Sequence, residues 1–116
     1  MTTNFKLILS DKANIVLKNG KAKLVCQTKY EQIFKYRLTR ESCIILSLFD
    51  GTRTLDKIID DVARLFNSGR NGAAKIVDKA INSFHQYIAE TKAVTRSLPT
   101  ISEIIENVST DALYAE

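Results

Sequence analysis

The sequence has no tryptophan, one histidine, one proline and two cysteines. Cys26 and Cys43 are far apart, and with the lone His85 they make no recognisable metal-ligand set. We therefore expect no metal and no cofactor. Free cysteine usually packs as a small hydrophobe, so both cysteines should be buried, whereas His85 should be a surface residue.

Long apolar runs are also missing. The longest, around Cys43 to Leu46, is far shorter than the roughly 20 residues that a membrane-spanning helix needs. The N-terminal residues Met-Thr-Thr-Asn-Phe-Lys lack the basic, apolar and small-residue pattern of a secretory signal. We expect a cytoplasmic protein with no membrane partner.

The charge balance is positive, with a net charge of +4 over 116 residues. Clustered cations would indicate an anionic partner such as nucleic acid or an acidic peptide. Here they are spread along the chain, which favours a solvated surface. These residues are Lys18, Lys21, Lys23, Lys29, Lys35, Arg37 and Arg40. The apolar content of 45% suffices for one core, so we expect a single folded domain.

A hairpin is the clearest local signal. Asn19-Gly20 separates two alternating segments, residues 14–18 and 21–26, and accepts the positive φ angles of a type I′ turn. With a two-residue loop, one face is apolar and the other is wet. The apolar face holds Ile15, Leu17, Ala22 and Leu24, and the wet face holds Val16, Lys18, Lys21 and Lys23.

Two further segments alternate as strands. Residues 5–9 predict an additional edge strand, and residues 33–39 predict the strand that follows the hairpin. In the latter, Phe34, Tyr36 and Leu38 should share one side, and Ile33, Lys35 and Arg37 the other.

Helical periodicity begins at Thr39, an expected N-cap, and the first helix stops at Asp50-Gly51. A second helix follows Thr54, whose hydroxyl can cap it, and runs to about Phe66. Asp60 and Asp61 should both face solvent on this helix. They diverge by about 100° and so do not form a catalytic pair.

A third, longer helix is predicted from about Ala73 to Thr91. Its central apolar line is Val77, Ile81, Phe84 and Ile88, and a half-apolar flank lies beside it at Ile76, Ala80, Ser83 and Tyr87. After Pro99, Thr100-Ile-Ser-Glu103 matches a capping box for a short fourth helix, which could dock or detach.

These elements predict an α+β fold of winged helix-turn-helix-like type. An N-terminal antiparallel three-stranded sheet precedes a three-helix bundle, and a short C-terminal helix follows. We place the domain at residues 1–92 and a linker with the short helix at residues 93–116.

The stretch from Leu38 to Ile59 resembles the precursor-peptide recognition domains related to the pyrroloquinoline quinone synthesis protein D (PqqD-like domains). In that family a strand ends in a leucine and a polar cap, a helix carries an Ile-Leu pair, and Asp-Gly-x-x-Thr leads into the next helix. The matching residues here are Leu38, Thr39, Ile45, Leu46, Asp50, Gly51 and Thr54. These motifs mark the fold and do no chemistry.

The resemblance implies a non-catalytic module of peptide natural-product biosynthesis. Such a module captures the leader of a ribosomally made precursor peptide as an added strand, against the third helix, and presents it to a modifying enzyme in trans or fused. The receiving strand would be Ile33, Phe34, Lys35, Tyr36 and Arg37. The helix would contribute Ile76, Lys79, Ala80, Ser83 and Tyr87.

The alternatives are a DNA-binding winged-helix transcriptional regulator, an enzyme and a generic peptide adaptor. Lys75, Lys79, Asn82 and Gln86 partly fit a recognition helix, but Asp78 interrupts them and the sheet precedes the helices instead of supplying a wing after them. No phosphate loop, nucleophile elbow or acid–base pair points to an enzyme. The precursor, the modifying enzyme and dimerisation through the outer strand stay open.

Overall fold

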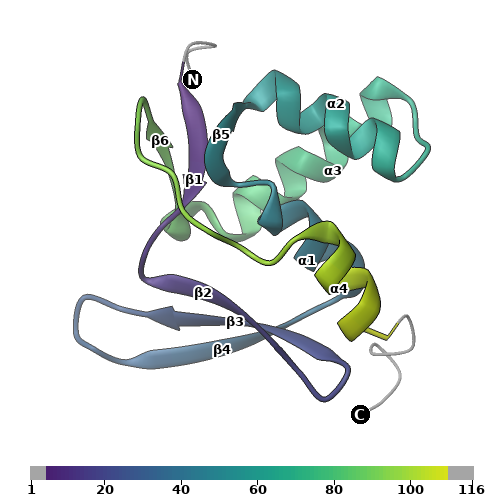
Figure 1. The fold of residues 1–116 in the computed structure, drawn as a ribbon. Helices are drawn as coiled ribbons and strands as arrows, with labels where there is room; N and C mark the ends of the chain where they lie inside the picture. Colours follow the sequence, from purple (N-terminus) through teal and green to yellow (C-terminus); the bar gives the residue numbers. More distant parts are fainter. Residues whose placement is uncertain (1–4, 110–116) are drawn as a thin grey trace. The chain divides into compact units, whose positions relative to one another are not determined.

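The computed structural model describes residues 5–109, and the chain is an α+β protein (Figure 1). Within these residues there are two three-stranded antiparallel sheets and four α-helices. The chain divides into two compact units, and each is built from two separate segments. The first unit contains residues 5–10 and 48–97, and the second contains residues 11–47 and 98–109. The predicted boundary at residue 92 stays a prediction.

The first unit combines one sheet with a pair of packed helices (Figure 1). Its sheet has the strand order β5-β1-β6, and α2 packs against α3. The elements are β1 (Lys6–Leu9), β5 (Asp50–Thr54), α2 (Leu55–Leu65), α3 (Arg70–Ser83), the 3₁₀ turn η1 (His85–Tyr87) and β6 (Ile88–Thr91).

Strand β1 is the central strand of this sheet, so its prediction as an edge strand is wrong. It pairs antiparallel with β5 on one side and with β6 on the other. Leu7 and Leu9 are fully buried. A short apolar run with partners on both sides is typical of a central strand, but the partners follow β1 by more than forty residues.

The third helix is shorter than predicted. It ends at Ser83, and Phe84 forms its C-cap with φ −123° and ψ 26°. Ile88 to Thr91, predicted as its last turn, form β6, in which Ile88 pairs with Leu9 and Thr91 with Lys6. The apolar spacing of this segment is compatible with a helix as well as with a strand. The segment forms a strand because β1 supplies its hydrogen-bond partners.

Gly51 occupies a position in β5 that requires glycine. Its φ is +89°, and a Cβ built there would overlap the carbonyl oxygen of Val94. We expect Gly51→Ala to destabilise the protein by about 1–3 kcal/mol, because the backbone would have to move. Gly72→Ala is the control, since it adds a methyl group to an exposed helical position without close neighbours and should be neutral or stabilising. Urea unfolding of both variants measures the two changes in the free energy of unfolding, which should be a decrease for Gly51→Ala and no change or an increase for Gly72→Ala.

The second unit contains the predicted hairpin. Asn19 and Gly20 have φ of 55° and 75°, Lys18 pairs with Lys21, and the apolar and wet faces are those predicted. The sheet has the order β2-β3-β4. The elements are β2 (Ala13–Lys18), β3 (Lys21–Gln27), β4 (Ile33–Leu38), α1 (Arg40–Ser47) and α4 (Ile101–Asn107).

The N-caps predicted for three of the helices, α1, α2 and α4, are confirmed. The backbone N–H of Ser42 donates to Thr39 Oγ1 at 3.0 Å, and that of Lys57 donates to Thr54 Oγ1 at 3.3 Å. Thr100 and Glu103 form the complete capping box of α4. This short helix docks in the second unit, where it contacts α1 and β2 and buries Ile104 and Val108.

Both cysteines are buried and reduced, as predicted. Within residues 5–109 no helix has the length and apolar character needed to cross a membrane, and no cluster of histidine, cysteine and carboxylate side chains could hold a metal. The N-terminal residues 1–4, which enter the prediction of localisation, lie outside the described part of the chain.

Candidate functional site

Strand β4, the predicted receiving strand, forms one edge of the β2-β3-β4 sheet. Its register pairs Cys26 with Phe34 and Leu24 with Tyr36. The tight turn makes Lys18–Lys21 a hydrogen-bonded pair, and hydrogen-bonded and non-bonded pairs alternate along each ladder. The backbone groups of Phe34 and Tyr36 therefore point to β3, and those of Ile33 and Lys35 point to the outer edge.

The side chains of β4 alternate as predicted between the two faces. Phe34 and Tyr36 lie on the apolar face but are 45% and 44% exposed, although their partners Cys26 and Leu24 are fully buried. Ile33, on the opposite face with Lys35 and Arg37, is 63% exposed. The sheet therefore ends in an exposed apolar rim.

The helix residues of the predicted site belong to the first unit. Ile76, Lys79, Ala80 and Ser83 lie on α3, and the Ile76 side chain is 37% exposed. Tyr87 lies outside the helix, on η1, and its carbonyl accepts a hydrogen bond from the Ser10 N–H at 2.6 Å. Its placement on the third helix was wrong, because the chain turns at Phe84.

A hollow of about 420 Å³ lies between α2 and α3 of the first unit. It was not predicted, because its walls come from helix faces that meet only through packing. Lys75 and Asp78 stand beside apolar side chains there. Its lining is Leu55, Ile59, Ala74, Lys75, Asp78 and Ile81.

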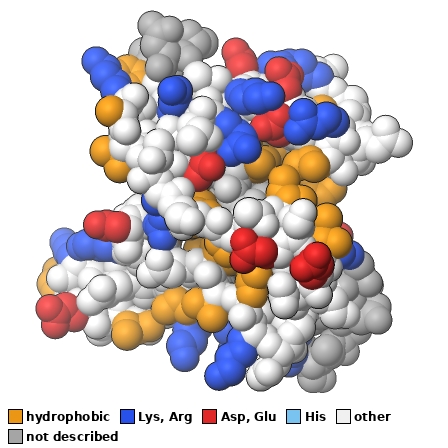
Figure 2. Space-filling model, in the orientation of Figure 1, with side chains coloured by type: hydrophobic (Ala, Val, Ile, Leu, Met, Phe, Trp, Pro, Cys, Tyr) orange, Lys and Arg blue, Asp and Glu red, His pale blue; other side chains and the backbone are white. Residues whose placement is uncertain are grey.

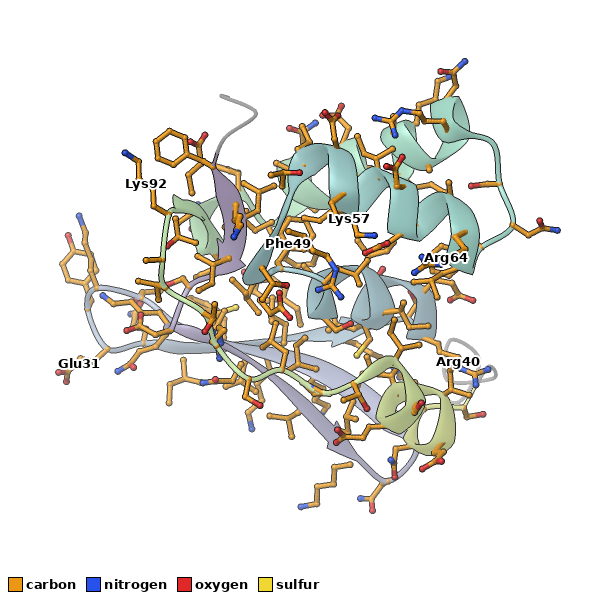
Figure 3. All side chains as sticks on the ribbon, turned by 45° about the horizontal axis from the view of Figure 1, so that its top comes forward. Glu31, Arg40, Phe49, Lys57, Arg64 and Lys92 are labelled. Atoms are coloured by element: carbon orange, nitrogen blue, oxygen red, sulfur yellow. The ribbon has the colours of Figure 1, made fainter. Side chains whose placement is uncertain are left out.

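Asp61 is buried, so its prediction as a solvent-facing partner of Asp60 is wrong. Its carboxylate accepts from Arg53 Nε of β5 at 2.8 Å and pairs with Lys57 Nζ at 3.1 Å and Arg64 Nη2 at 3.3 Å. Lys57 and Arg64, labelled in Figure 3, extend from α2. Asp60 is exposed and pairs with Arg70.

Two ionisable side chains, Cys43 and Asp61, have a pKa that differs from its ordinary value. Burial raises the pKa of the Cys43 thiol to about 12, so this cysteine is a poor nucleophile at neutral pH. Burial also acts to raise the pKa of Asp61, but hydrogen bonds and charges from Lys57 and Arg53 outweigh it and hold that pKa below the usual range. The Asp61 carboxylate is thus held by ion pairs within the first unit, and the Cys43 thiol is buried.

A second hollow, of about 490 Å³, opens on the wet face of the β2-β3-β4 sheet. The sequence placed Lys18, Lys21 and Lys23 on this face, but only as solvated surface. The signal that identifies the hollow is the strand register, which brings Lys35 of β4 to the same face. Its lining is Val16, Lys18, Asn19, Lys21, Lys23, Val25 and Lys35.

Comparisons with known proteins add no relative. No protein-family model matches the chain, and no curated protein or solved structure matches it either. The resemblance to PqqD-like domains therefore stays a prediction, which depends on the residues between Leu38 and Ile59.

Proposed function

We propose that the chain is a non-catalytic peptide-binding module that captures the leader of a ribosomally made precursor peptide and presents it to a modifying enzyme. The observation that carries this proposal is the position of β4 at the edge of its sheet, with the backbone groups of Ile33 and Lys35 directed outward. An exposed edge is a liability for association, and its retention is explained by a partner strand.

The two faces of β4 define what such a strand should carry. Leader side chains on the apolar face would extend the row of Phe34 and Tyr36, and those on the other face would lie beside Lys35 and Arg37. Each exposed ion pair adds only about 0.2–1 kcal/mol. Apolar anchors beside the two aromatic residues should therefore supply most of the affinity, and acidic residues should tune specificity.

The family resemblance assigns further leader contacts to the helix, and these are a separate part of the proposal. Ile76, with its exposed side chain, is the strongest anchor that α3 offers. The winged helix-turn-helix-like arrangement predicted from the sequence, an N-terminal three-stranded antiparallel sheet followed by a three-helix bundle, is part of the proposal. Ile76→Ser in the leader titration tests the helix contribution independently of β4.

We expect Lys35→Pro to weaken leader binding at least about tenfold, whereas Lys35→Ala should weaken it only a few-fold. Proline at position 35 removes a backbone N–H that points to the outer edge and is not used by the β3–β4 ladder, so an added strand loses a hydrogen bond there. Alanine keeps this N–H and removes only the charged side chain. The measurement is calorimetric titration with the N-terminal half of a short precursor peptide encoded beside the gene.

Thermal unfolding of both variants controls for folding, and it should show a small difference because edge strands tolerate proline. Equal affinities of the proline and alanine variants would rule out strand addition at β4. Absence of leader binding together with tight DNA binding would reverse the order of the two candidate functions.

The second candidate is a DNA-binding winged helix, and the position of β6 favours it. The sequence predicted that the sheet precedes the helices and that no wing follows them, and this is wrong because β6 follows α3 and pairs with β1. Lys75 and Lys79 are exposed on α3, but exposed Asp78 stands between them. Retention on duplex DNA that falls with salt and with Lys79→Gln would support this candidate.

A further inference from the structure

The outer face of the β2-β3-β4 sheet collects positively charged side chains. None of the three strands contains aspartate or glutamate. The register places Lys18 opposite Lys21 and Lys23 opposite Arg37. In Figure 2, blue Lys and Arg side chains project below these strands beside orange hydrophobic atoms.

This arrangement of like charges lowers the stability of the isolated sheet. Like charges that face each other across two strands are destabilising, and a carboxylate at either position would relieve the repulsion. Within residues 5–109, no ion pair joins Lys18, Lys21, Lys23 or Lys35 to a carboxylate. These four lysines are thus complementary to an anionic partner that the described residues of the unit do not supply.

The hollow on this face also has an apolar floor. Val16 of β2 and Val25 of β3 lie among the four lysines, and the Val16 side chain is 41% exposed. A volume of about 490 Å³ falls in the range of ordinary ligand sites. The hollow can therefore receive an apolar side chain whose neighbours along the chain are negatively charged.

We propose that this lysine face binds an acidic segment of another polypeptide, in which an aliphatic side chain sits on Val16 and Val25 and flanking carboxylates pair with the lysines. The partner follows from the chemistry of the hollow. It lies on the face of the sheet and centres on β3. It shares Lys35 with the β4 edge proposed for the leader, but Lys21 and Lys23 belong to the hollow alone.

Two other anionic partners fit this face less well. A nucleic acid offers phosphates but no aliphatic group for the valine floor, and the hollow has neither an aromatic side chain for base stacking nor an arginine fork for phosphate. A bilayer surface attracts lysines, but it cannot enter a recess to reach the valines. An extended acidic segment satisfies both the charges and the floor.

The test uses the full chain and a short amidated peptide with glutamate at every second position, serine between, and leucine in place of the central glutamate. We expect fluorescence anisotropy of the labelled peptide to show salt-sensitive binding. The double variant Lys21→Gln, Lys23→Gln should weaken it roughly tenfold or more, because two of the four lysines are neutralised. The melting temperature of the variant should be unchanged or higher, because the substitutions relieve repulsion between lysines.

The matched control is Lys6→Gln, Lys29→Gln, which removes the same charge from exposed positions outside the hollow and should change affinity less than about twofold. A peptide with glutamine for glutamate should lose binding, and one with serine for leucine should bind several-fold more weakly. Equal weakening by both double variants would overturn the proposal. So would failure of the acidic peptide to bind, or stronger lysine-dependent binding to duplex DNA or to phosphatidylserine vesicles.

Discussion

Replacing Ile104 by alanine should destabilise the second unit by about 2–5 kcal/mol. Ile104 is fully buried, on the side of α4 that packs in this unit, so the substitution removes apolar contacts and leaves a cavity. The neighbouring Ile105 is 50% exposed, and Ile105→Ala should cost well under about 1 kcal/mol. Urea unfolding of the two variants measures the difference between adjacent residues of the same type.

We expect a large loss of stability because α4 contacts the rest of the unit through buried side chains and through hydrogen bonds at the surface. Besides Ile104 and Val108, the Arg40 guanidinium donates to the Ile105 carbonyl at 2.9 Å, and the Ser109 N–H donates to the Gly20 carbonyl at 3.0 Å. If both isoleucine variants lost only a small and similar part of the free energy of unfolding, α4 would be only weakly docked. The alternative left open by the sequence, a detachable helix, would then hold.

The elements that could be predicted are those whose signals are local. Asn19-Gly20 determines its own turn geometry, and Thr39, Thr54 and Thr100 each cap a helix that begins at the next residue. In the turn two adjacent residues adopt positive φ, and in the caps a threonine side chain satisfies a backbone group three residues away. Neither signal requires knowledge of distant packing.

The elements that could not be predicted depend on distant partners. Ile88 to Thr91 form a strand because β1 supplies the hydrogen bonds, and β1 is central because β5 and β6 flank it. Periodicity measures only which side chains share a face, and it is ambiguous for short apolar runs. The two-sided pairing of β1 therefore appears in the structure alone.

The candidate site shows the same division. Alternation along β4 correctly predicted which side chains share each face, because the period of a strand is fixed at two. The lysine hollow requires the register of three strands. The burial of Asp61 requires Arg53, which comes from β5, an element that the sequence presented only as a helix-stopping turn.

Asp61→Asn should destabilise the protein by about 2–3 kcal/mol at neutral pH. The buried carboxylate balances Arg53, Lys57 and Arg64, and the amide would leave these three cations facing one another. The cations are partly exposed, so the cost should be below that of a fully buried pair. Asp60→Asn is the control, because exposed Asp60 pairs only at the surface and its loss should cost less than about 1 kcal/mol.

The pH dependence distinguishes lost charge from lost packing. The pKa of Asp61 in the folded protein is lowered from the ordinary 3.8, so the unfolded chain binds this proton more readily. The stabilisation by Asp61 is therefore fully present above pH 3.8 and is lost as the pH falls through the lower folded pKa. The free energies of unfolding of the native protein and of Asp61→Asn should converge in that acid range. A difference that stays constant down to the acid limit would assign the effect to packing and contradict a charge-based role, because the asparagine cannot titrate and only the native carboxylate loses its charge there.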